Sequence, residues 1–134
     1  MSTTSGFLKK HEDLYSALIA KTKYATYNKY DSENSLSLGS FPAIGIFLGT
    51  STNSKECNSY VPIEYTFVLM TADLYDRDDP ADQKTKQYAM FELIEDVIAE
   101  FGFEVITDIE PMISIAFGEG SFITGFTTMI KFNA

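Results

Sequence analysis

Residues 60–102 read YVPIEYTFVLMTADLYDRDDPADQKTKQYAMFELIEDVIAEFG, and they hold a strand pattern, an acidic turn and a helix pattern in direct succession. From Tyr60 to Tyr75 apolar side chains alternate with more polar ones, which is the two-residue period of a strand with one apolar face. After the turn at 76–80, apolar residues recur at spacings of three and four up to Phe101, the period of an amphipathic helix. The helix is expected to fold back and cover the sheet that contains the strand.

The composition predicts a single domain spanning residues 1–134. Apolar residues make up 45% of the chain and aromatic residues 14%, which is typical of a globular protein and argues against a disordered one. A chain of this length suits one hydrophobic core. The 19 Asp and Glu residues against 10 Lys and Arg give a formal net charge of -9, which disfavours binding to nucleic-acid phosphates or to anionic lipid.

No apolar run approaches the ~18 residues that cross a bilayer, and the N-terminus lacks the apolar centre of a signal peptide. We therefore expect a soluble protein, made in a cytoplasm, with no membrane partner. Cys57 is the single cysteine, so no internal disulfide is expected, and no Cys or His lies near it at metal-ligand spacing. Redox and zinc chemistry are not expected.

The outer parts of the chain predict elements that complete the central sheet. They are a first amphipathic helix at 6–22, a strand at 41–48, a brief strand at 103–105, and a hairpin of 112–117 and 121–132 around a glycine turn. The predicted class is α+β, a mostly antiparallel sheet of about four strands with two helices on one face, in the order helix, strand, strand, helix, strand, strand.

Two polar segments, 23–40 and 49–59, are predicted to be long loops, and the second to form an exposed arm or flap. Loops of this length in a small domain are usually functional or become ordered against a partner. His11 lies on or beside the apolar stripe of the first helix, where a packing role is favoured over a catalytic one.

The most conspicuous polar cluster surrounds Pro80 and offers oxygen ligands for Ca²⁺ or Mg²⁺. Its members are Asp73, Asp76, Asp78, Asp79 and Asp82. The loop lacks the glycine and the terminal Glu of a helix-loop-helix calcium site. Helix capping explains the same residues, with Asp79 as N-cap, Pro80 at the first helical position and Asp82 in the first turn.

An acidic face without lysine or arginine marks the second helix, and its residues are Glu92, Glu95, Asp96 and Glu100. Like charges four residues apart cost a few tenths of a kcal/mol in an isolated helix. The face is either solvated or meets lysines on the first helix of a neighbouring subunit, for which the candidates are Lys9, Lys10, Lys21 and Lys23. Charge reversal at Glu92 and Asp96 would then weaken assembly.

Motifs of catalysis and cofactor binding are missing from the sequence. It contains no serine nucleophile elbow, no metalloprotease helix, no dinucleotide fingerprint and no phosphate-binding loop. The acidic pairs on the second helix could act as general acid and general base, but no pocket-forming motif accompanies them. We therefore expect neither an enzyme nor a bound cofactor.

The order of elements at 41–48, 60–76, 82–101 and 121–132 resembles that of tail-terminator and tail-completion proteins of tailed bacteriophages. The aromatic-proline pair that opens a short strand in that family is Phe41-Pro42 here. The chain departs from the family pattern by an insertion at 53–59 and a link at 103–111.

The resemblance implies a non-enzymatic virion protein at the junction of neck and tail, synthesised in the cytoplasm of a bacterial host. Such proteins form closed rings, usually hexamers, with a dodecamer as the alternative, and contact neighbouring connector and tail proteins. DNA passes through the lumen as non-specific cargo. An acidic channel would repel its phosphates, so that the DNA slides through without binding. A podophage-type connector ring protein, and a small metal- or ligand-binding domain using the Asp76–Asp82 loop, remain the alternatives.

Overall fold

The computed structural model of the chain describes residues 3–22, 25–29, 41–56, 59–112, 115–116 and 120–134. Its elements, in chain order, are α1 (Thr3–Lys21), β1 (Ala25–Lys29), β2 (Ala43–Glu56), β3 (Ser59–Asp76), α2 (Pro80–Phe101), β4 (Glu104–Val105), β5 (Glu110–Pro111), β6 (Ile115–Ala116) and β7 (Ser121–Asn133).

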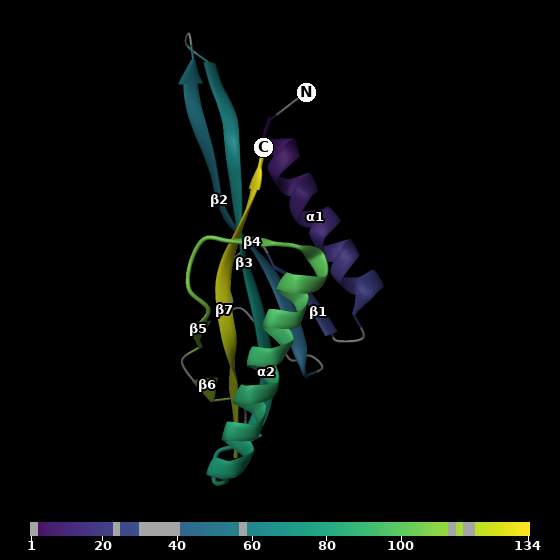
Figure 1. Cartoon of the computed structure of the whole chain (residues 1–134), viewed down its shortest axis with the longest axis vertical. Coiled ribbons are helices and arrows are strands. Elements are labelled where there is room, and N and C mark those ends of the chain that lie inside the picture. The colour runs from purple at the N-terminus through teal and green to yellow at the C-terminus, as the bar shows by residue number, and fades with distance from the viewer. Residues whose placement is uncertain (1–2, 23–24, 30–40, 57–58, 113–114, 117–119) are drawn as a thin grey trace.

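The strands form one sheet in the order β1-β2-β3-β7-β4, and β5 and β6 also pair with β7. β1 runs parallel to β2, whereas every other pairing is antiparallel. Both helices pack on the same side of this sheet (Figure 1). The predicted α+β class, with a mostly antiparallel sheet and two helices on one face, is confirmed.

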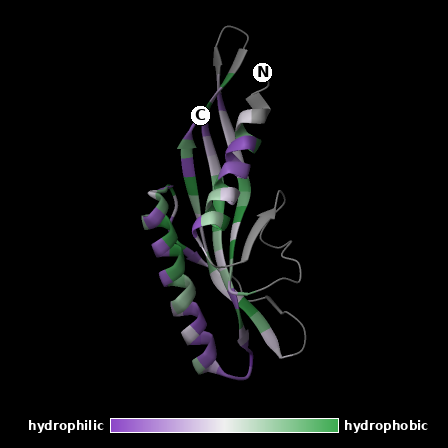
Figure 2. Ribbon diagram, turned by 90° about the vertical axis from the view of Figure 1, so that its right-hand side faces the viewer, coloured by the Kyte–Doolittle hydropathy of each residue, from purple (hydrophilic) through white to green (hydrophobic). Residues whose placement is uncertain are grey.

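The main core lies between the helices and the sheet. α1 contributes Leu14 and Leu18, α2 contributes Ile94 and Val97, and Phe67 of β3 lies between them, wholly buried. Hydrophobic and hydrophilic residues alternate along α2, as expected for a helix with one buried face (Figure 2). The predicted covering of the central strand by the following helix is therefore what the structure shows.

A second, smaller core lies on the opposite face of the sheet, where the alternation in the central strand had indicated a more polar surface. Its buried members are Phe47, Met70, Ala72 and Ile123. Partly buried side chains from other parts of the chain, among them Phe41 and Met112, pack against it. The sheet is thus apolar on both faces at its centre.

The first half of α2 is attached to the sheet by polar contacts. The Thr71 hydroxyl donates to the Met90 carbonyl at 2.8 Å, and the Lys86 ammonium lies 3.7 Å from the Asp73 carboxylate. The second half packs through apolar side chains. The orientation of α2 on the sheet is set by both kinds of contact.

Capping at the ends of α2 follows the prediction. The Asp79 carboxylate accepts hydrogen bonds from the backbone N–H groups of Ala81 and Asp82, at 3.1 and 3.3 Å. Pro80 begins the helix, and Gly102 ends it in the left-handed conformation, with φ of 66°. A left-handed residue here is typical of glycine after a helix.

Both predicted loops contain strands. Within 23–40 the structure places β1, and the rest of that segment lies outside the described residues. Within 49–59, β2 continues to Glu56 and β3 already begins at Ser59. Strands pair through backbone groups, so the polar side chains of residues 49–59 gave no indication that this segment forms strands.

The segment after α2 runs along β7 as one interrupted edge strand. Glu104 pairs with Lys131, Glu110 with Thr127, and Ile115 with Ile123. The predicted brief strand appears as β4, and the predicted terminal hairpin as β6 and β7. Interruptions and Pro111 make this edge a poor template for pairing with another chain.

Candidate functional site

The hairpin of β2 and β3 projects beyond the rest of the domain. β7 ends its pairing at Asn133, opposite Glu64, while β2 and β3 continue to pair with each other from Asn53 and Pro62 to Glu56 and Ser59. We call residues 53–56 and 59–63 the arm. It extends past the C-terminal end of β7 and past the start of α1 (Figure 1).

Two irregularities at the base set the direction of the arm. In the first, Gly49 and Thr50 of β2 lie opposite Thr66 alone. The Thr50 N–H donates to the Thr66 hydroxyl at 2.8 Å, so this bulge leaves that donor satisfied. In the second, Ile63 is the extra residue on β3. Bulges bend strands and increase their twist, so both re-aim the hairpin as it leaves the sheet.

An ion-pair cluster lies beside the base of the arm. The Lys131 ammonium is 3.9 Å from the Glu64 carboxylate and 3.7 Å from the Glu104 carboxylate. It therefore joins β3, β7 and β4 across three neighbouring strands. Partly exposed pairs of this kind contribute about 0–1 kcal/mol each, so the cluster orients side chains more than it stabilises the fold.

Apolar side chains on the arm face solvent. Val61 is 42% exposed and Ile63 is 50% exposed, although both belong to the alternating pattern that predicts the core. They lie beyond the last residue of β7, and among the described residues no third strand or helix covers their side chains, although the Ala134 N–H donates to the Ile63 carbonyl at 3.1 Å. The alternating pattern identified Val61 and Ile63 as apolar strand residues. It could not show that β7 ends before it reaches them, so it could not show that they are exposed.

A groove of about 490 Å³ separates the C-terminal ends of α1 and α2. Its more buried lining residues are Thr22 and the apolar side chains of Leu93, Val97 and Phe101. Its exposed lining residues are charged, with Asp96 and Glu100 from α2 and Lys21 from α1. The Lys21 ammonium lies 5.2 Å from the centre of the Phe101 ring.

The electrostatic potential of this groove is expected to be negative. Both helices present their C-terminal, carbonyl-rich ends to it, and α2 has no basic residue in its last turn. A carboxylate near that end opposes the helix dipole by typically 0.3–1 kcal/mol. Glu100, in the last turn of α2, is therefore placed against the helix dipole, and Asp96 one turn earlier adds a second negative charge. Lys21 is the cation that shares their groove.

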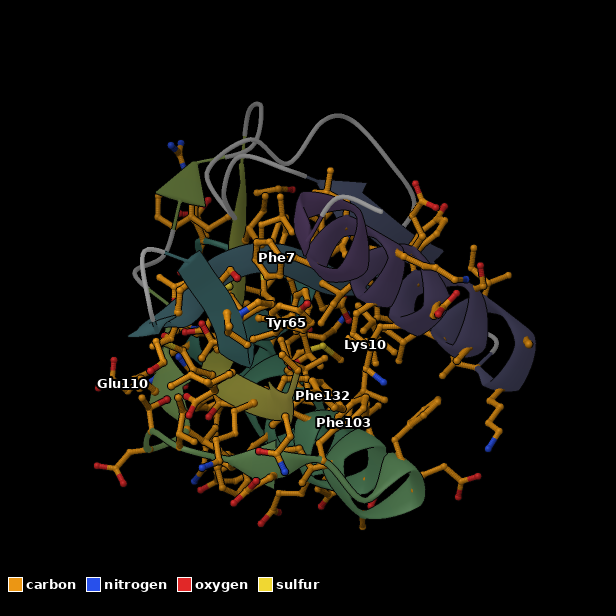
Figure 3. The ribbon with its side chains drawn as sticks, turned by 90° about the horizontal axis from the view of Figure 1, so that it is seen from above. Phe7, Lys10, Tyr65, Phe103, Glu110 and Phe132 are labelled. Atoms are coloured by element: carbon orange, nitrogen blue, oxygen red, sulfur yellow. The ribbon has the colours of Figure 1, made fainter. Side chains whose placement is uncertain are left out.

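The lysines proposed as an intersubunit surface lie in different environments. Lys9 forms an exposed pair with Asp13 at 3.4 Å. Lys10 points from α1 toward Phe132, with its ammonium 4.4 Å from the ring centre (Figure 3). Lys21 lines the groove, and Lys23 lies outside the described residues. Lys10 and Lys21 thus contact aromatic rings of their own chain.

The acidic face of α2 remains exposed. Glu92 and Glu95 lie outside the groove, whereas Asp96 and Glu100 line it. Within the described part of the chain, none of these four carboxylates lies within 4.0 Å of a basic side chain. The structure therefore brings Asp96 and Glu100 together with Lys21 in one subunit, and leaves the acidic face open.

The carboxylates around Pro80 bind backbone groups. Asp82 accepts from the Asp76 N–H at 2.9 Å, Asp76 accepts from the Asp78 N–H at 3.0 Å, and Asp79 caps α2. In the described ranges, no three His, Cys, Asp or Glu side chains are grouped so as to hold a metal ion. Capping and turn formation account for Asp76, Asp79 and Asp82, while Asp73 pairs with Lys86 and Asp78 with Arg77.

His11 packs inside the main core, as predicted, and is wholly rather than partly buried. Its Nε2–H donates to the Ile46 carbonyl at 2.8 Å, and its ring lies 6.0 Å from that of Phe67. The residue therefore ties α1 to β2.

None of the helices that the structure describes is long and apolar enough to cross a membrane. A scan against protein-family models finds no match for the chain, and a search of curated proteins finds none either.

Proposed function

We propose that this chain is a ring-forming structural protein of the tailed-bacteriophage neck, similar to a tail terminator, which joins connector and tail around the DNA channel. The observation that carries this proposal is the arm, a two-stranded extension with exposed Val61 and Ile63 that no other segment among the described residues covers.

An arm of this construction is better suited to an assembly than to an isolated domain. A two-stranded hairpin without a third strand or a packed helix is marginally stable in water. Contact with a neighbouring molecule would cover its apolar side chains and stabilise it. A ring also needs two different complementary surfaces on each subunit, and the arm and the acidic helix α2 are separate features of one chain.

The charge of the chain fits a DNA channel. A net charge of -9 repels phosphate, so DNA would pass through a lumen lined by this protein without binding to it. The exposed carboxylates of α2 contribute to that field.

The test is the oligomeric state of the purified chain and its location in particles. Native mass spectrometry should give a discrete oligomer, a hexamer or a dodecamer, and negative-stain electron micrographs should show rings. A monomer at all accessible concentrations would contradict the proposal. Labelled protein in virions should be found between capsid and tail; in a short-tailed particle, the same ring would instead be the podophage-type connector.

The alternative of a metal- or ligand-binding domain at Asp76–Asp82 gains no support from the geometry, because Asp76, Asp79 and Asp82 already accept backbone hydrogen bonds. If that alternative were correct, Ca²⁺ or Mg²⁺ would raise the melting temperature of the monomer.

A further inference from the structure

We draw no further inference here: the strongest candidate, the groove between the C-terminal ends of α1 and α2, is lined by Lys21 of its own chain, whose ammonium lies 5.2 Å from the centre of the Phe101 ring, and nothing in the structure shows what covers the rest of it.

Discussion

Thr66 shows how a single hydroxyl shapes the molecule at the residue scale. It lies opposite the bulge formed by Gly49 and Thr50, accepts the Thr50 N–H at 2.8 Å, and is 2.9 Å from the Thr50 hydroxyl. Gly49 is required there because a Cβ would come within 2.5 Å of the Thr66 carbonyl oxygen. The close approach of the two strands and the hydrogen bond to the hydroxyl together define the bulge.

Replacement of this hydroxyl should therefore destabilise the base of the arm. Thr66→Val keeps the shape of the side chain but removes the hydrogen bond to the Thr50 N–H, and because Thr50 is exposed, a net loss of about 0.5–1.5 kcal/mol is expected. Urea unfolding measures the change, and amide exchange at Thr50 should become faster. Thr52→Val is the matched control, because Thr52 is exposed and its hydroxyl holds no hydrogen bond that the structure records; equal losses in both variants would show that the bulge does not depend on Thr66.

At the scale of the element, α2 depends on contacts within a few residues of each end. Asp79 caps its first turn, and Gly102 ends it where a left-handed residue is required. Both were predictable because capping involves groups two to four residues apart in sequence. The length of the helix follows from these two residues.

Loss of the cap should be measurable. Asp79→Ala removes the acceptor for the Ala81 and Asp82 N–H groups and should lower the free energy of unfolding by about 0.5–2 kcal/mol. Thermal or urea unfolding provides the measurement. Asp78→Ala removes a neighbouring exposed carboxylate that accepts none of these hydrogen bonds, and it should change stability by less than about 0.5 kcal/mol. A smaller loss for Asp79 than for Asp78 would contradict the capping role.

At the scale of the whole molecule, the two cores and the arm are separable. Among the side chains that the structure describes, the buried apolar residues all lie outside residues 53–63. The main core joins α1, α2 and the centre of the sheet, and the second core covers the other face. The folding of the domain should therefore not require the arm, whereas the proposed assembly should.

A shortened chain tests this separation. Replacing residues 53–63 by Asn-Gly closes β2 and β3 with a two-residue turn between Thr52 and Glu64, which are paired in the sheet. We expect a cooperative melting transition within a few degrees of that of the full chain, together with loss of the oligomer in native mass spectrometry. A shortened chain that still assembles would show that the arm is dispensable, and one that fails to melt cooperatively would show that the arm belongs to the fold.

Local patterns were sufficient for the central elements. The strand expected at 60–75 is observed at 59–76, and the helix expected to end at Phe101 does so. The acidic face of α2 could also be identified in advance, because helical period places Glu92, Glu95, Asp96 and Glu100 on exposed positions. Each of these features depends on residues that are close in sequence.

Tertiary contacts decided the rest. The parallel pairing of β1, the second core and the contacts of Lys10 with Phe132 join segments that are distant in the chain. The arm is the clearest case: Val61 and Ile63 have the pattern of core residues, yet they are exposed because β7 ends opposite Glu64. Periodicity records which face of a strand is apolar, but burial requires a neighbour on that face, and the position of that neighbour is set by pairing across the whole sheet.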